Sequence, residues 1–244
     1  MSLAFEKWEG LGNHFVLLES LPNEVTVQEL CDPRRGVGAD GVIVLGCEPP
    51  TMTIFNADGS RAAMCGNGLR CAARWFAART VDLGSGIQTD SGLMRVGEVA
   101  DEVAVVVGTP SLMGRGEFNG CAYIAVDIGN PHAVFIDPPA LFDLEAVGQA
   151  MQTHPDFAGG VNVHEVRTGA SALIVVPFER GVGLTQACGT GAAASAFAVQ
   201  AERKSAWPMT TELPGGMLHF EMGEAGALWM HGPARQVFTG TWSR

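Results

Sequence analysis

The chain has 244 residues, of which 47% are hydrophobic and 17% charged, a composition typical of a folded globular protein rather than a disordered one. Its formal net charge of −11 argues against non-specific binding to nucleic acid or to an anionic membrane, but not against a small anionic substrate held in a locally positive site. The first residues lack the basic and apolar regions of a signal peptide, and no apolar run approaches the roughly 20 residues of a membrane helix. We therefore expect a cytoplasmic protein.

Short β-branched or aromatic segments bounded by Gly, Pro or Asp predict strands, and Ala-rich segments predict helices. The tail at 228–242 is predicted to be a strand pair with a Gly-Pro break, which could return to either domain. The expected strands span residues 15–20, 41–47, 52–57, 102–108, 123–128, 132–137, 172–179 and 218–222, and the expected helices span 65–80, 143–152 and 188–204.

The segment 188–204 is apolar almost all round, which is typical of a helix buried on several sides. A sheet curled around such a helix, once per repeat, fits the pattern. The strands and helices do not alternate cleanly, so the expected fold class is mixed, strand-rich α/β. Neither GxGxxG nor GxxxxGK[ST] occurs, and a nucleotide-binding interpretation is therefore rejected.

An internal duplication is visible in the sequence. Residues 55–73 align without a gap on residues 178–196, with five identical positions and an offset of 123 (188 − 65). A weaker similarity joins 10–18 to 128–136 in the same order. Chance likeness between small-residue segments is the alternative. The duplication predicts two pseudo-symmetric domains, 1–112 and 117–225, with an active-site cleft between them and with strands from 226–244 joining the first domain.

Six cysteines occur at positions 31, 47, 65, 71, 121 and 188, without a CxxC pair or zinc-ligand spacing, so we expect reduced thiols and no metal. Four of them are predicted to be small buried hydrophobic residues. Cys65 and Cys188 differ, because each begins a predicted helix in a Cys-Gly-x-Gly corner and each occupies the same place in its repeat.

A thiol at a helix N-terminus meets unpaired N–H groups and the positive end of the helix dipole, which stabilise the thiolate. The same N–H groups can hold a carboxylate. With a substrate carboxylate there, one thiolate could remove the α-proton and the other thiol could return a proton to the opposite face. The pair is expected to titrate as a unit, with one thiol ionised in each productive state. Buried structural thiols and a redox pair are the alternatives.

Several motifs together resemble the diaminopimelate epimerase family, in the family's order over nearly the whole chain. They are GLGNHFVLLE (10–19), RRGVGADGVIVL (34–45), FNADGSRAAMCGNGLRCAARW (55–75), GNPHAVF (129–135), GVNV (160–163), FERGVGLTQACGTGAAA (178–194) and GPARQVFTG (232–240).

The resemblance implies a homodimer in which each chain has two curled sheets around central helices. It also implies interconversion of L,L- and meso-2,6-diaminopimelate without pyridoxal phosphate or any other cofactor, for lysine and peptidoglycan synthesis. By position, Cys65 and Cys188 match the two catalytic cysteines, and His132 and Glu179 match groups that tune them. The matching substrate-binding positions are Asn13, Asn56, Gly66, Asn67, Asn130, Asn162, Glu179, Arg180, Gly189 and Thr190.

The residue chemistry agrees, because Arg180 suits a bidentate carboxylate contact and Glu179 an ammonium group. An Asn in an ADG or GNP segment can instead be a turn residue, and His132 can be an ordinary packed histidine. His14, Gly41 and Ala133 depart from residues common in the family, and the chain is compact around 19–31 and 45–52.

Three hypotheses therefore stay open. The first is a diaminopimelate epimerase. The second is a relative with another substrate, such as a broad amino-acid racemase or, less favoured because it would not need two cysteines, a phenazine-pathway-type isomerase. The third is a binding protein that closes on an amino acid without chemistry.

Overall fold

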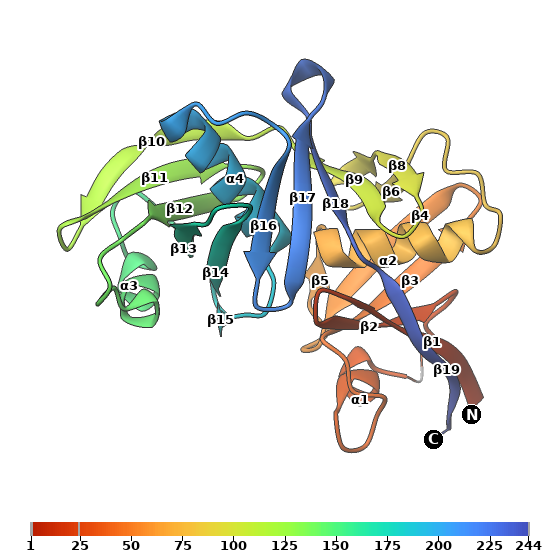
Figure 1. Cartoon of the computed structure of the whole chain (residues 1–244). Helices are drawn as coiled ribbons and strands as arrows, with labels where there is room; N and C mark the ends of the chain where they lie inside the picture. Colours follow the sequence, from red (N-terminus) through yellow and green to blue (C-terminus); the bar gives the residue numbers. More distant parts are fainter. Residues whose placement is uncertain (1, 24, 244) are drawn as a thin grey trace. The chain divides into compact units, whose positions relative to one another are not determined.

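A computed structural model describes residues 2–23 and 25–243 of the chain (Figure 1). The chain forms two compact units. Unit 1 runs from the N-terminus to Val106 and resumes at His231, and unit 2 comprises Val107–Met230. The chain thus leaves unit 1 within β9 (Val103–Gly108) and returns within β18 (Leu228–Gly232). The expected boundary at residue 112 lies inside β10 (Ser111–Phe118), whereas the structure divides the units between Val106 and Val107.

Unit 1 is built on one sheet in the order β19-β1-β2-β3-β4-β6-β7, with β5 paired to β4. The C-terminal strand β19 lies antiparallel to β1, so the last strand of the chain closes the N-terminal unit. A short hairpin joins β8 to β9. The elements are β1 (Ser2–Gly10), β2 (Asn13–Leu18), α1 (Val27–Cys31), β3 (Gly41–Cys47), β4 (Pro50–Asn56), β5 (Arg61–Ala62), α2 (Gly66–Ala77), β6 (Ile87–Thr89), β7 (Gly92–Met94), β8 (Val96–Val99) and β19 (Arg235–Ser243).

Unit 2 carries a second sheet in which β10-β11-β12-β13-β14-β16-β17 are neighbours and β15 pairs with β14. Its elements are β10, β11 (Cys121–Asp127), β12 (Pro131–Ile136), α3 (Leu144–Met151), β13 (Asn162–Thr168), β14 (Leu173–Glu179), β15 (Gly183–Leu184), α4 (Gly189–Arg203), β16 (Met209–Leu213), β17 (Gly216–Met222) and the 3-10 turn η1 (Glu224–Gly226).

The two units repeat one topology, as the internal duplication predicts. In each unit, a small helix connects two neighbouring parallel strands along the chain, β2-α1-β3 in unit 1 and β12-α3-β13 in unit 2. In each unit, the long central helix lies in chain order between the two strands of a second parallel pair, β4-α2-β6 and β14-α4-β16. The sheet orders β1-β2-β3-β4-β6-β7 and β11-β12-β13-β14-β16-β17 therefore correspond strand for strand.

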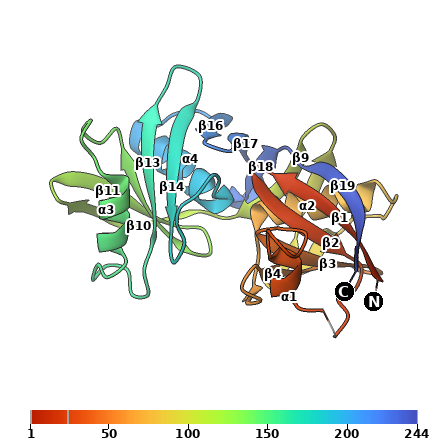
Figure 2. The same ribbon diagram turned by 90° about the horizontal axis from the view of Figure 1, so that it is seen from below.

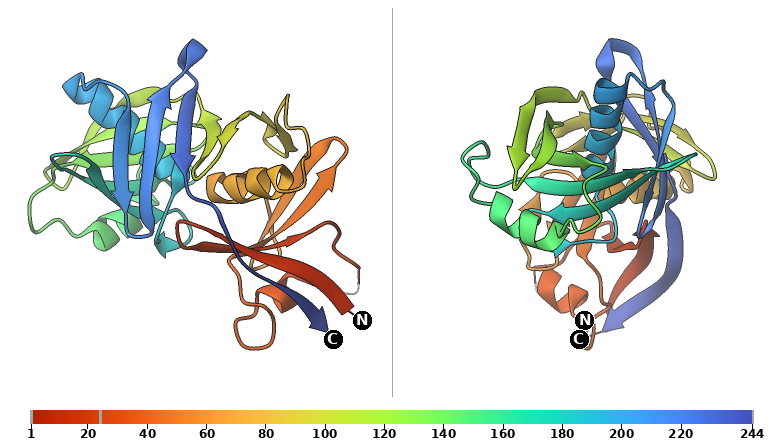
Figure 3. Two further views of the ribbon diagram at one scale, coloured as in Figure 1. Left: turned by 45° about the vertical axis from the view of Figure 1, so that its right-hand side comes forward. Right: turned by 60° about the vertical axis from the view of Figure 1, so that its left-hand side comes forward.

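Each long helix packs against its own curled sheet. Helix α2 contacts β1 to β4, and α4 contacts β11 to β14, β16 and β17 (Figures 2 and 3). Most side chains of the Ala-rich helix α4 are buried, which accounts for its apolar character all round. The mixed α/β fold with a curled sheet around a helix in each repeat is confirmed.

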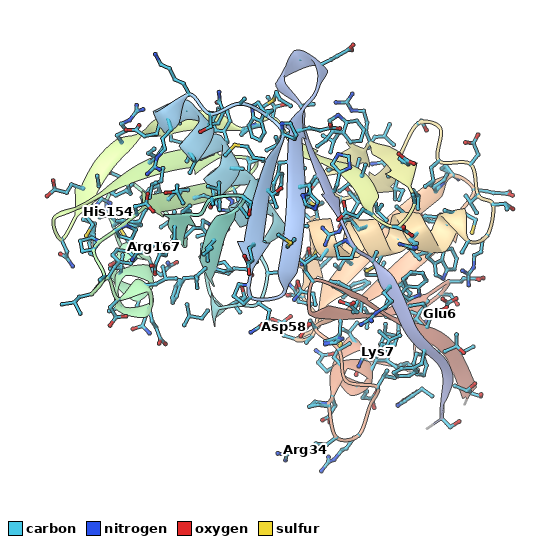
Figure 4. The ribbon with its side chains drawn as sticks, viewed as in Figure 1. Glu6, Lys7, Arg34, Asp58, His154 and Arg167 are labelled. Atoms are coloured by element: carbon cyan, nitrogen blue, oxygen red, sulfur yellow. The ribbon has the colours of Figure 1, made fainter. Side chains whose placement is uncertain are left out.

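A carboxylate ties three elements of unit 1 together. Glu6, which is labelled in Figure 4, lies on β1. Its carboxylate accepts hydrogen bonds from the indole N–H of Trp8 at 2.8 Å and of Trp75 at 3.1 Å, from Gln236 at 2.7 Å, and from the guanidinium of Arg79. Because Trp75 and Arg79 lie on and just after α2 and Gln236 on β19, this carboxylate fixes the helix and the C-terminal strand against β1.

All eight expected strands and all three expected helices are present, with ends shifted by up to three residues. The predicted tail pair is also two strands, but β19 pairs with β1. Helix α1, strands β1, β10, β13 and β16, and the short strands β5, β6, β7, β8 and β15 were not expected from the sequence. No helix in the described part of the chain is both long and apolar enough to cross a membrane.

Candidate active site

Cys65 occupies the N-cap position of α2, with an extended backbone (φ −143°, ψ 119°) that turns the chain into the helix. Its carbonyl accepts the first helical hydrogen bond, from the N–H of Leu69 at 2.8 Å. The N–H groups of the intervening residues point out of the helix end, where an anion can be bound. Gly68 allows the helix to approach the sheet, because a Cβ there would lie only 2.9 Å from Cδ1 of Ile43.

A buried polar network supports this helix start. Asn67 donates from Nδ2 to Oδ1 of Asn13 at 2.5 Å, and its own Oδ1 accepts from the guanidinium of Arg70 at 2.9 Å. Arg70 is fully buried and also donates to the carbonyls of Gly66 and Pro233. Burial lowers the pKa of Arg70, but a guanidinium keeps its charge in proteins. The network brings together Asn13, Gly66 and Asn67, three of the predicted substrate-binding residues.

Asn56 lies apart from this network, at the exposed end of β4. Its side chain donates to Oγ of Ser60 at 2.9 Å, and its backbone exchanges hydrogen bonds within the turn that follows. Asn56 therefore stabilises the turn to β5, which agrees with the alternative interpretation of an Asn in this segment.

Cys188 begins α4 in the same way, with an N-cap backbone at φ −125° and ψ 104° and its carbonyl bonded to the N–H of Ala192 at 2.8 Å. Its thiol is buried, and Sγ lies 3.6 Å from Oγ1 of Thr190. The Glu179 carboxylate faces the thiol and accepts a hydrogen bond at 2.6 Å from Thr185.

The expectation that the helix start lowers the pKa of this thiol is wrong for Cys188. Burial is the largest cause and raises the pKa, and the negative charge of Glu179 raises it further. The hydroxyl of Thr190 and the N–H of Gly191 act in the opposite direction but do not outweigh burial. Cys188 is therefore a neutral thiol at neutral pH in this structure.

Asn162 and Arg180 form a connected corner of unit 2. Oδ1 of Asn162 accepts from the backbone N–H of Arg180 at 3.1 Å, and its Nδ2 donates to the carbonyl of Pro131 at 3.1 Å. The guanidinium of Arg180 is exposed and donates to the carbonyl of Gly159 at 3.2 Å. Asn162 thus orders the backbone that carries Glu179 and Arg180, while Arg180 keeps donors available to a ligand.

His132 is fully buried on β12 and is bonded on both ring nitrogens. Nε2 lies 2.8 Å from Oδ1 of Asn130, and Nδ1 lies 2.8 Å from Nε2 of His164 on β13. The two rings stack, with centroids 5.1 Å apart. Burial lowers the pKa of His132 well below its usual value and that of His164 to about 3, so both rings are neutral.

The three departures from the family pattern have local explanations in part. A Cβ at Gly41 would lie 2.5 Å from the carbonyl oxygen of Phe55, so this backbone excludes a side chain there. Ala133 is fully buried in the hydrophobic cluster with Tyr123 and Phe135. His14 is exposed, and its backbone exchanges two hydrogen bonds with Asp40: its N–H donates to Oδ2 and its carbonyl accepts from the N–H of Asp40, both at 2.8 Å.

Arg70, His164 and Thr185 were not identified from the sequence as site residues. Arg70 follows Asn67 by three positions on an apolar helix, a spacing that places the two side chains on one face. His164 has the same parity as Asn162 on β13, so alternation places it on the same face of the sheet. Those two signals were present, whereas Thr185 carries none that we recognise.

The two helix starts offer the same chemistry twice, a sulfur beside helical N–H groups, while their neighbours differ. The neighbours in unit 1 are amides and a buried cation, and those in unit 2 are a carboxylate, a hydroxyl and a neutral histidine pair. The sulfur of a thiol next to a carboxylate side chain can release or take up a proton. Helical N–H groups can stabilise the negative charge on the carboxylate of a bound ligand.

Comparison with known proteins places these features in a family. Residues 5–113 and 124–237 match the family described as diaminopimelate epimerase. The diaminopimelate epimerase of Cyanothece sp. (strain PCC 7425 / ATCC 29141) is 37% identical over 280 aligned residues, which cover 98% of this chain and 99% of that protein. The chain has 244 residues, so the alignment contains insertions in the relative.

Solved structures with low sequence identity share the fold. A Bacillus anthracis phenazine biosynthesis protein of the PhzF family superposes with a TM-score of 0.74 at 12% identity, over 100% of both chains. A probable proline racemase from Agrobacterium radiobacter K84 gives a TM-score of 0.71 at 12% identity, over 99% of this chain and 93% of that one. At such identities the likeness establishes the architecture alone.

Proposed function

The chain belongs to the diaminopimelate epimerase family, and we propose that it interconverts L,L- and meso-2,6-diaminopimelate without a cofactor, using Cys65 and Cys188 as the two proton-transfer groups. The observation that supports this most directly is the repeated placement of a cysteine at the N-cap of the long central helix of each unit. The match to the family over most of the chain supports the substrate.

The proposed reaction is a 1,1-proton transfer at one α-carbon. One sulfur, as thiolate, takes the α-proton and becomes a thiol, and the electron pair of the C–H bond passes into the substrate carboxylate. The other thiol then gives its proton to the opposite face of the same carbon and becomes the thiolate. Proton and charge balance, since one thiol and one thiolate are present before and after the transfer.

The helix N-termini would hold the reacting carboxylate. Gly66 and Asn67 in unit 1, and Gly189 and Thr190 in unit 2, supply backbone N–H groups where negative charge develops. Donors already aimed at the carboxylate stabilise the carbanion more than the ground state, which is the requirement for catalysis.

At the opposite end of the substrate, selectivity would come from the corner of unit 2. Arg180 can bind the distal carboxylate through two parallel N–H donors, and Asn162 holds the backbone of Arg180 in place. The Glu179 carboxylate, which faces the Cys188 thiol, can accept the proton of that thiol when Cys188 acts as base and attract the substrate ammonium group.

We further propose a cytoplasmic homodimer that serves lysine and peptidoglycan synthesis. The composition and the absence of a spanning helix in the described residues are consistent with this location.

An exchange assay tests the proposal. The protein is incubated with L,L-diaminopimelate in D2O without pyridoxal phosphate, and α-deuterium incorporation and stereochemistry are followed. We expect deuterium incorporation together with formation of the meso isomer. Exchange only with other amino acids would indicate a racemase of different specificity, and tight binding without exchange would indicate a binding protein.

Replacement of each cysteine tests the two-thiol mechanism separately. We expect Cys65→Ala and Cys188→Ala each to abolish epimerisation, because either change leaves one face of the α-carbon without a proton-transfer group. Cys71→Ala is the matched control, since Cys71 is fully buried on the same helix as Cys65. Full activity in either of the first two variants would contradict the mechanism.

A further inference from the structure

A chain of three side chains leads from the core of unit 2 to a predicted substrate-binding amide. His164 lies 2.8 Å from His132, and His132 lies 2.8 Å from Oδ1 of Asn130. Both rings are fully buried, whereas Asn130 is half-buried. In the described part of the chain, Nδ1 of His164 has no hydrogen-bond partner.

The direction of the hydrogen bonds follows from this. Oδ1 of Asn130 accepts, so His132 donates from Nε2 and its Nδ1 must accept from Nε2–H of His164. His164 is then unprotonated at Nδ1, the atom without a partner. The reverse direction would bury an N–H donor without an acceptor, which is unfavourable and rarer in proteins than an unused acceptor.

We propose that His164 is a positioning residue that, through His132, turns the amide nitrogen Nδ2 of Asn130 toward a carboxylate of the substrate. This inference rests on the proposed function for the identity of the ligand. Because Oδ1 of Asn130 accepts from His132, the two N–H donors of the amide are directed away from the histidine and are the groups best placed to meet a ligand. Those donors suit a carboxylate and reject an ammonium group.

The surroundings of His164 hold this arrangement in place. The ring packs against the start of α4, where a Cβ on Gly191 would lie 2.7 Å from Nε2 and 2.9 Å from Nδ1 of His164. On the parallel strands, His132 is opposite Asn162 and His164 is opposite Val134, so the two histidines are diagonal neighbours on one face. Burial also keeps both rings neutral, so each ring carries one proton. The two hydrogen bonds require that proton on Nε2 in both histidines.

Nuclear magnetic resonance can measure the tautomer without any substrate. Long-range proton–nitrogen spectra of histidine-labelled protein at neutral pH distinguish a protonated Nε2 from a protonated Nδ1, and a His132→Gln variant identifies the signals of His132. We expect His132 to carry its proton on Nε2. A proton on Nδ1 of His132 in the unaltered protein would overturn the inference.

Variants of His164 then connect the tautomer to binding. His164→Leu removes the donor to His132, so we expect a shift toward the Nδ1–H tautomer and a KM for diaminopimelate raised about ten-fold, with a smaller change in kcat. In His164→Gln the side-chain amide can still donate to Nδ1 of His132, so this variant should restore the Nε2–H tautomer of His132 and the KM for diaminopimelate. If the leucine variant does not fold, His164→Asn, whose amide is too short to reach, takes its place.

Val166→Ala is the control for lost packing, because Val166 is fully buried two residues further along the same strand. We expect it to lower stability but to leave the tautomer and KM unchanged. An unchanged tautomer and KM in His164→Leu would overturn the inference. The predicted tautomer in a protein without epimerase activity would refute the proposed function and the substrate part of the inference, while the hydrogen-bond chain would stand.

Discussion

Gly191 and Gly68 occupy the same place in the two repeats, three residues after the cysteine, and a methyl group added at each should have very different effects. At Gly191 a Cβ would lie 2.7 Å from Nε2 of His164 and closer still to Cε1. An ordinary contact needs about 3.5 Å or more, so the ring would have to move by roughly 1 Å. His164 is fully buried and has packed atoms on every side.

The magnitude for Gly191→Ala follows from three contributions. Overpacking of a buried site costs about 1–3 kcal/mol. Moving the ring of His164 also breaks its 2.8 Å hydrogen bond to His132, which leaves a buried nitrogen unsatisfied at a cost of about 1–3 kcal/mol. Alanine in place of a helical glycine returns up to about 1 kcal/mol. We expect a net loss of about 3 kcal/mol in the free energy of unfolding.

Gly68→Ala is the matched control, because its Cβ would meet Cδ1 of Ile43 at 2.9 Å and Cδ1 of Ile54 at 3.3 Å. Both atoms end flexible side chains, so the helix gain should offset most of the clash and leave stability within about 1 kcal/mol. Urea unfolding followed by circular dichroism measures both. Equal losses in the two variants, or no loss in Gly191→Ala, would refute the packing argument.

Three other predictions concern charge and protonation. Glu179→Gln removes a carboxylate that raises the pKa of Cys188, so iodoacetamide should alkylate this thiol faster at pH 8, whereas Thr190→Val should slow alkylation; peptide mass spectrometry checks both. Arg70→Met leaves Oδ1 of Asn67 without its buried donor and should lower the free energy of unfolding by about 2 kcal/mol, measured in urea. The buried histidine pair is neutral when folded, with one pKa lowered from 6.5 to about 3, so the unfolded chain binds more protons below pH 6.5. Stability should therefore fall as the pH decreases from 6.5 toward 5, by up to about 1.4 kcal/mol per pH unit for each histidine, and an unfolding series across this range that stays flat would contradict the pairing.

The sequence predicted those elements whose pattern is local. Apolar strands such as β3 and the Ala-rich helix α4 carry their own signal. Strand β1 was not expected, because it is stabilised by pairing with β19 across more than 200 residues of sequence, and a pattern read over a few neighbouring residues does not detect such a partner. Helix α1 has only five residues, yet its capping box, in which Thr26 and Glu29 bond each other's backbone, was a usable signal.

The same distinction applies to the site. Residues within one motif, such as Cys65 with Asn67, could be grouped from the sequence because a helix start fixes their spacing. The bond between Asn67 and Asn13 spans 54 residues and depends on how β2 packs beside α2. The pKa of Cys188 was predicted with the wrong sign, because the helix dipole is local whereas desolvation is a property of the whole packed unit.

The duplication supplies two sulfurs in equivalent places, but divergence has given them opposite electrostatic neighbours. With the offset of 123, Arg70 corresponds to Ala193 and Glu179 corresponds to Asn56. The thiol of unit 1 thus interacts with a buried cation and the thiol of unit 2 with a carboxylate. A positive charge favours an ionised sulfur and a negative charge a neutral one. In the mechanism that we propose, two identical thiols would compete for the same role, and this asymmetry would distinguish the sulfur that begins as the base from the one that begins as the acid.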